Sequence, residues 1–295
     1  MRVTNKMIKM NSLDSLQQNL NKLSRLQDQL GSGKNISRPS DDPILATRAM
    51  DLNGTLAEIT QYTKNVDDNI SWLDFTDSSL NDVTNIIHRS KELAVEGASD
   101  ALAEGSRDAI AAEVDQLIEQ LVSIGNSSLG GRYIFAGFKT KGDNPFQRTG
   151  DTVSYNGDSG KIRREISPGV EMAVNVTGKE VFMDSGIFDT LTELKDALNN
   201  ADTDKITSDV IGQLEDSLDK VLTGRSEMGA KSRRMELAKE RISRDEINFK
   251  NLLSQFQDID VAEIAVELQM QQNIYQTALS AMAKTIQPSL INFLR

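Results

Sequence analysis

Apolar residues near the N-terminus recur at alternating spacings of three and four, which is the heptad pattern of a coiled-coil seam. The segment 11–31 carries this pattern, and Gln27 is its polar interruption. The seam residues are Leu13, Leu16, Leu20, Leu23 and Leu30. Because polar side chains separate them, we predict a helix with one narrow apolar stripe, which is only marginally stable alone in water.

A matching stripe occupies the C-terminal region, with Gln272 and Ser289 as polar gaps. Its apolar members are Val261, Ala265, Leu268, Tyr275, Leu279, Met282, Ile286 and Phe293. We therefore expect the two termini to meet as a coiled coil. Two stripes this narrow bury too little area to hold roughly seventy residues by themselves, so we favour assembly contacts with other subunits over closure within a monomer.

The pattern between the termini begins with two further helices. Asp41 or Asp42 can cap a helix whose first residue is Pro43, where the missing N–H costs nothing. Apolar residues at helical spacing continue over 44–93, and a second helix over 106–124 can be capped by Ser106. Together these segments predict a helical hairpin.

The period changes after residue 131 and indicates β structure. Asn156-Gly157 predicts a hairpin turn between strands at 153–155 and 162–166. Pro168-Gly169 opens an alternating segment at 170–176, which is typical of a half-buried strand.

Helical periodicity returns at 184–198, where Asp184 or Ser185 is a candidate cap. It resumes at 204–256, and the segment 258–260 then separates it from the terminal helix.

The predicted fold is mainly α and elongated, with a small β domain, and the chain runs out through helices and back through helices. It has three parts. They are a terminal coiled-coil assembly domain of 1–42 with 258–295, a helical rod of 43–130 with 184–257, and a β domain of 131–183. Aromatic residues make up only 5 % of the chain, which favours thin helical cores over one broad globular core.

Composition excludes several kinds of chemistry. The absence of cysteine removes disulfides, thiolate metal sites and a cysteine nucleophile. One histidine, His88, excludes motifs that need a histidine pair. The net charge of −11 opposes nucleic-acid binding. The sequence contains no run of 18 apolar residues, so we expect no membrane span. Residues 1–10 lack the apolar core of a cleaved signal peptide.

Two motifs near the first helix have ordinary structural interpretations. The run Gly31 to Lys34 lacks the spacing of a phosphate loop, because Asp28 and Asn35 occupy positions that need glycine and Ser or Thr. Asp41 and Asp42 resemble a carboxylate pair for a metal or for acid–base work, but a helix cap explains them.

Other candidates favour packing over catalysis. His88 has no serine–acid frame around it, so we interpret it as a surface or interface residue. Trp72 lies in the apolar register of its helix, which indicates a core or subunit-contact residue. Acidic residues interleave with the basic stretch 231–244, which favours a salt-bridged face. We expect no cofactor, no metal and no enzymatic activity.

Several segments resemble the N-terminal region of bacterial flagellins and their hook-associated relatives. These are SGKNISRPSDDP at 32–43, QYTKN at 61–65, Trp72-Leu73 and KELAVEGA at 91–98. The motif residues are Ser37, Pro39, Ser40, Asp41, Asp42, Pro43 and Trp72. GRYIFAGFKT at 131–140 and the ending 258–294 are similar to the branch of the family found at the junction between hook and filament.

The resemblance implies an extracellular structural adaptor of the bacterial flagellum. It implies export through the flagellar type III apparatus, a cytoplasmic chaperone at the C-terminal helix, and assembly by coupled folding of the terminal helices. The partners it implies are a homo-oligomeric ring, the first hook-associated protein on the hook side and flagellin on the filament side. A filament flagellin is the alternative within the family. Outside it, the alternative is an adhesin or binding module using Phe135, Phe138, Phe146 and Tyr155.

Overall fold

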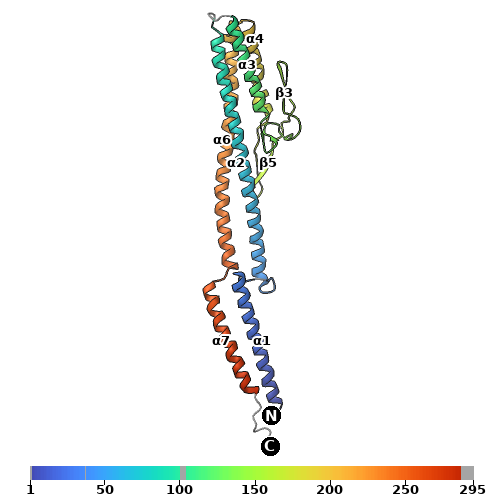
Figure 1. Cartoon of the computed structure of the whole chain (residues 1–295), viewed down its shortest axis with the longest axis vertical. Coiled ribbons are helices and arrows are strands. Elements are labelled where there is room, and N and C mark those ends of the chain that lie inside the picture. The colour runs from blue at the N-terminus through green and yellow to red at the C-terminus, as the bar shows by residue number, and fades with distance from the viewer. Residues whose placement is uncertain (1, 37, 100–103, 287–295) are drawn as a thin grey trace. The chain divides into compact units, whose positions relative to one another are not determined.

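The computed structural model describes residues 2–36, 38–99 and 104–286 and is mainly helical, with short β-hairpins (Figure 1). Its contacts divide the chain into two compact units. The terminal unit is Met1–Glu58 with Asp245–Arg295, and the middle unit is Ile59–Arg244. The mainly helical fold predicted from the sequence is confirmed, whereas the three-part domain division stays a prediction.

Helices make up most of both units. The α-helices are α1 Arg2–Ser32, α2 Pro43–Gly97, α3 Glu104–Gly125, α4 Ile187–Asn199, α5 Thr203–Lys205, α6 Ile211–Gln257 and α7 Val261–Ile286. Two π-helical turns, η1 Lys179–Met183 and η2 Ile206–Val210, precede α4 and α6. Among the described helices, none is long and apolar enough to cross a membrane.

The helix starts follow local capping chemistry where the sequence supplies a suitable aspartate. Asp42 Oδ1 accepts hydrogen bonds from the backbone N–H groups of Ile44 and Leu45, at 3.0 Å each, so the predicted cap before Pro43 is confirmed. Asp260 caps α7 in the same way through the N–H groups of Ala262 and Glu263, at 2.9 and 3.2 Å.

Two predicted caps are wrong. α3 begins at Glu104, two residues before Ser106. α4 begins at Ile187, after the π-helical turn η1 that occupies the chain up to Met183, so neither Asp184 nor Ser185 holds the N-cap position. Gly186 holds it with φ 76°, a left-handed conformation that favours glycine, and Ser185 Oγ still accepts the Ile187 N–H at 3.4 Å.

Three separate antiparallel hairpins form the β structure of the middle unit. β1 Ser128–Leu129 pairs with β2 Arg132–Tyr133, β3 Phe146–Thr149 with β4 Thr152–Tyr155, and β5 Arg163–Ser167 with β6 Val170–Ala173. The register of the third hairpin shifts between Glu165 and Ser167.

One of the two predicted hairpin turns is correct. Pro168-Gly169 joins β5 to β6, with Ser167 opposite Val170. The turn predicted at Asn156-Gly157 is wrong, because β4 pairs backwards with β3 around Gly150, whose φ is 65°. The Asn156 N–H instead donates to the Pro145 carbonyl at 2.8 Å.

Aromatic rings form the centre of the middle unit's core. Phe182 lies 5.1 Å from Phe135 and 5.0 Å from Phe146 between ring centroids, and Phe188 adjoins both Phe146 and Phe182. The Tyr155 hydroxyl lies 2.8 Å from the Phe135 carbonyl, and burial of the phenol raises its pKa to about 12. The aromatic residues near the hairpins therefore serve mainly as core.

An ion-pair network ties the β3–β4 hairpin to α3 and α4. Arg148, on β3, pairs with Asp115 and with Glu119, the latter at 2.8 Å. Lys195, on α4, lies 3.3 Å from Asp115 and also pairs with Asp151. The hydrogen bond from Arg148, with a smaller contribution from Lys195, lowers the pKa of Asp115 below its ordinary value of 3.8.

We predict that Asp115 makes the middle unit acid-sensitive. Because its folded pKa is depressed, its stabilisation is present above the unfolded pKa and is lost as pH falls towards the folded pKa. Asp115→Asn should lower the free energy of unfolding at pH 7 by about 1 kcal/mol, a modest value because the pair is partly solvated. Urea unfolding at pH 7 and pH 3 measures this, and the loss should shrink at pH 3.

The matched control is Asp108→Asn, an exposed aspartate on the same helix. Equal effects of the two substitutions at pH 7 would contradict a special role for Asp115.

Candidate assembly surface

The loop after α1 is bound to the junction between α6 and α7 within the terminal unit. Asn35 N–H donates to the Gln257 carbonyl at 2.7 Å, and Ile259 N–H donates to the Gly33 carbonyl at 3.2 Å. Lys34 and Asp258 form an isolated antiparallel bridge between these hydrogen bonds. This backbone connection places the end of α1 beside the start of α7.

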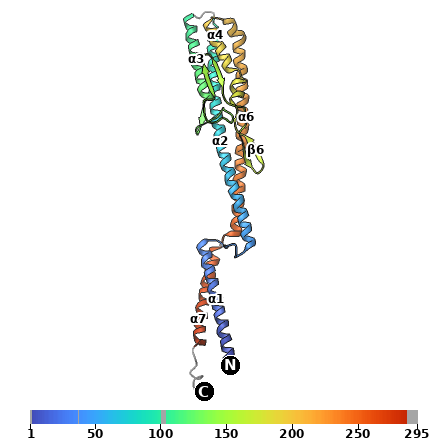
Figure 2. The same cartoon turned by 90° about the vertical axis from the view of Figure 1, so that its right-hand side faces the viewer.

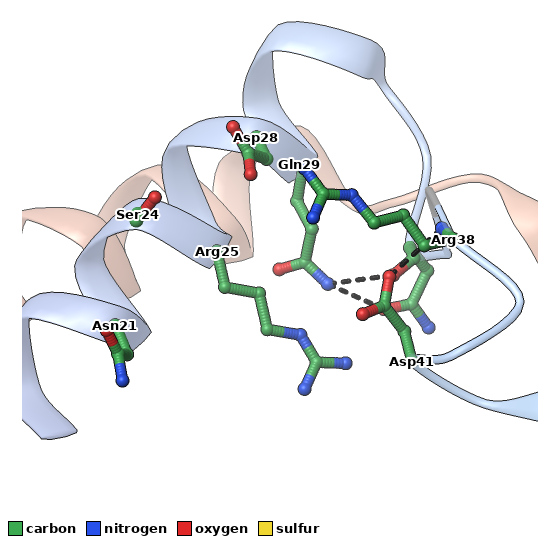
Figure 3. A pocket seen from close by; sticks show the side chains of 8 residues that line it. Asn21, Ser24, Arg25, Asp28, Gln29, Arg38 and Asp41 are labelled. Atoms are coloured by element: carbon green, nitrogen blue, oxygen red, sulfur yellow. Dashed lines mark hydrogen bonds between the residues drawn. The ribbon is translucent and has the colours of Figure 1, made fainter.

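The motif residues shape this loop. Gln29, which is labelled in Figure 3, is buried and donates to the backbone and side-chain oxygens of Asn35 at 3.0 and 2.9 Å. The Asp41 carboxylate accepts the Arg38 backbone N–H at 3.0 Å. Arg25 and Arg38 both line the polar pocket drawn there, of about 190 Å³. The motif therefore acts through loop geometry and through the cap at Asp42.

The remaining described motif residues lie in the loop, at the start of α2 and within α2. Pro39 and Ser40 are exposed in the loop, Pro43 is the first residue of α2, and Trp72 is buried. Ser37 lies outside the described residues.

α1 and α7 lie side by side, as expected for a coiled coil (Figures 1 and 2). Half of the predicted seam is correct, because six of its residues are half-buried at a spacing of seven. These residues are Leu16, Leu23 and Leu30 on α1, and Leu268, Tyr275 and Met282 on α7.

The other half of the seam differs by one residue on each helix. Ser12, Asn19 and Leu26 replace the predicted Leu13, Leu20 and Gln27 on α1. Ile264, Gln271 and Ala278 replace Ala265, Gln272 and Leu279 on α7. Leu13, Leu20, Ala265 and Leu279 are therefore exposed, and their predicted place in the α1–α7 seam is wrong. Val261 shares the heptad position of Leu268 but is also exposed, as the first residue of α7, so its predicted place is wrong too. The Ile286 side chain and Phe293 lie outside the described residues.

A polar pair in the middle of the seam accounts for this register. Gln271 Nε2 donates to the Asn19 backbone and side-chain oxygens, at 3.3 and 3.1 Å. A buried polar residue at a seam position selects register at a cost in stability. Leu26, three residues after Leu23, is the sequence signal for this register.

Much of the terminal unit's apolar surface has no cover. Thirteen of the eighteen large apolar side chains that are exposed in the described part of the chain lie in this unit. By contrast, Leu26 and Ala46 are the only buried apolar side chains among its described residues. The isolated terminal unit thus leaves more large apolar side chains in water than it buries.

The clearest uncovered surface is the outer face of α7. Val266, Met270 and Ile274 recur every four residues and are 68, 53 and 44 % exposed. Because an α-helix turns about 100° per residue, they lie roughly opposite the seam residues Leu268 and Tyr275. Sequence reasoning missed this face because it assigned one stripe to each helix.

The remaining candidates behave as packing or surface residues. His88 is exposed, and the basic stretch pairs partly with acids, as in Arg233–Glu236 at 2.7 Å and Lys239–Asp67 at 2.8 Å. No group of three potential metal ligands occurs within the described ranges.

Comparisons with known proteins agree with these features. The bacterial flagellin N-terminal helical region matches residues 3–140, and the flagellin C-terminal helical region matches 211–294. Flagellar hook-associated protein 3 of Salmonella typhimurium is 26 % identical, over 97 % of this chain and 96 % of that protein. Its counterpart in Escherichia coli is 28 % identical, over 87 % of each.

A solved structure extends the similarity to the fold. The flagellar junction protein FlgL from Legionella pneumophila has a TM-score of 0.60 and 17 % identity, over 72 % of this chain and all of that one.

We predict that the polar pair sets the register of α1 against α7 at the expense of stability. Replacing both partners, by Asn19→Leu with Gln271→Leu, should slow amide hydrogen exchange in α1 and α7, because an apolar seam replaces a polar one. Gln17→Leu, at an exposed position of α1, is the control and should leave exchange unchanged. Faster exchange in the double variant would show that the pair is a net stabiliser.

Proposed function

Because this chain belongs to the flagellin family, in its hook-associated protein 3 branch, we propose that it is the adaptor subunit that joins the flagellar hook to the filament. It is a structural protein of the extracellular flagellum and not an enzyme. In the proposed mechanism, its terminal helices pack into a tube of subunits and complete their folding there.

The observation that carries this proposal is the uncovered apolar surface of the terminal unit. Monomeric proteins rarely expose contiguous apolar patches unless a partner covers them. Val266, Met270 and Ile274 on α7, together with Leu13 and Leu20 on α1, supply such surface on both terminal helices. The predicted assembly residues Leu16, Leu23, Leu30, Leu268, Tyr275 and Met282 then hold the helix pair that presents it.

The same surface supports the proposed export route. A unit with so few buried side chains unfolds at little cost, which suits passage in unfolded form. A chaperone that covers the outer face of α7 would keep Val266, Met270 and Ile274 from water before assembly. The ring of copies, the first hook-associated protein on the hook side and flagellin on the filament side are proposed as the partners after export.

Immunogold electron microscopy of intact flagella tests the proposed location. An antibody against residues 132–181 should label a single band where the hook meets the filament, and a strain lacking the gene should show none. Label along the whole filament would identify a flagellin instead. Absence of label from flagella would favour an adhesin or another exported assembly.

We predict that polar substitution on the outer face of α7 blocks assembly without unfolding the chain. Val266→Asp should leave the helical content by circular dichroism unchanged, because the side chain is exposed, yet abolish the junction band and swimming. Gln269→Asp, at a neighbouring exposed polar position, is the control and should assemble. Normal swimming of the Val266→Asp strain would exclude this face as an assembly contact.

A further inference from the structure

A small cleft in the middle unit is lined by residues of α2, of the segment after β2, and of the β5–β6 hairpin. Its volume is about 100 Å³. Trp72, Arg132, Phe138 and Arg164 are among its lining residues, and no carboxylate lines it. The cleft therefore combines aromatic surface with two guanidinium groups.

Phe138 is a fixed, exposed aromatic at this cleft. Its side chain is 65 % exposed, although most phenylalanines of the middle unit are in the core. Its backbone N–H donates to Asp158 Oδ1 at 2.8 Å, and its ring packs so closely on Gly160 that a Cβ there would overlap it. A pre-positioned aromatic at the surface is typical of a binding hot spot, because little side-chain entropy is lost on contact.

The polar groups at the cleft are mostly donors. The Arg132 guanidinium has no ion pair within the described residues, and Arg164 Nη1 lies 3.5 Å from Asp68 Oδ2. Trp72 is 8 % exposed, and its indole N–H has no acceptor in the described part of the structure. Such a donor set matches a carboxylate carried on a surface of small side chains.

The chain itself carries a surface of that kind. Asp74, Ser78 and Asp82 are exposed on α2 at a spacing of four, and neither aspartate has an ion-pair partner among the described residues. An α-helix turns about 100° per residue, so Asp74 lies roughly opposite Trp72 around α2. It rises about 1.5 Å per residue, so Asp82 lies about 15 Å from Trp72 along the helix axis.

We propose that the cleft of one subunit receives the Asp74–Asp82 face of α2 from a second copy of this chain. This inference rests on the proposed ring. A ring forms when two different, complementary patches on one subunit meet head to tail and the rotation closes. The cleft and the acidic face meet that requirement, because they have opposite charge and because Asp74 lies opposite Trp72 around α2.

Cysteine cross-linking in assembled flagella tests the contact, and the natural absence of cysteine makes it clean. Thr140→Cys lines the cleft and Ser78→Cys lies between the two aspartates. With a short bis-maleimide, the double variant should give multimers composed only of this chain, and each single variant should give none. Thr140→Cys with Thr223→Cys, which places the second thiol on exposed α6, is the control and should give none.

Charge reversal supplies an independent readout. Arg132→Asp should abolish the cross-linked multimers, and Asp74→Arg with Asp82→Arg should do the same, because each places like charges together. Combining all three substitutions should restore them. A chain that had merely failed to fold would show no such rescue.

The possible results separate this contact from the proposed function. If the antibody labels the junction but the Thr140–Ser78 pair gives no multimers, the proposed contact is wrong and the adaptor function still stands. The same holds if the Thr140–Thr223 control gives multimers. Cross-links to a different flagellar protein would overturn the second copy as occupant. Absence of the chain from flagella would overturn both the adaptor function and the contact that rests on it.

Discussion

The shortage of buried apolar area in the terminal unit is the constraint on which the other features depend. Fully burying a leucine-sized side chain contributes about 1.5–3 kcal/mol, whereas ordering each backbone residue costs about 1–2 kcal/mol. With only Leu26 and Ala46 buried among its described apolar residues, this unit does not offset the cost of ordering α1 and α7. We propose that contacts with neighbouring subunits supply the missing burial, which would couple folding of the terminal unit to assembly.

The middle unit has the opposite balance. Nearly all buried apolar side chains of the described chain lie there, including the cluster around Phe146 and Phe182. The ion pairs Arg148–Glu119 and Lys195–Asp151 attach the β3–β4 hairpin to α3 and α4 beside that core. A preformed unit of this kind holds surface groups such as Phe138 in place before a partner arrives. The well-buried core of the middle unit and the incomplete burial of the terminal unit thus suit different steps of the proposed assembly.

The sequence predicted what depends on local chemistry. The helices, the cap at Asp42 and the Pro168-Gly169 turn follow from patterns within a few residues, and each is confirmed. The hairpin at Asn156-Gly157 failed because β4 pairs with β3 across Gly150, a choice decided by packing of Tyr155 and Phe146. The predicted seam is half correct, because the heptad pattern selects Leu13 and Leu20, whereas the seam in the structure includes Asn19, which Gln271 contacts. That contact depends on how α7 lies beside α1, which the heptad pattern of either helix alone does not reveal.

The polar pair also explains why a weak seam suits this chain. A continuous leucine seam would bury more area, yet it would permit the two helices to slide or to pair with other copies. The hydrogen bonds from Gln271 to Asn19 fix one register. In that register, Leu13 and Leu20 on α1 stay uncovered at a set offset from Val266 and Met270 on α7. The proposed ring of identical subunits needs that constant offset, because every copy must present the same surface to its neighbours.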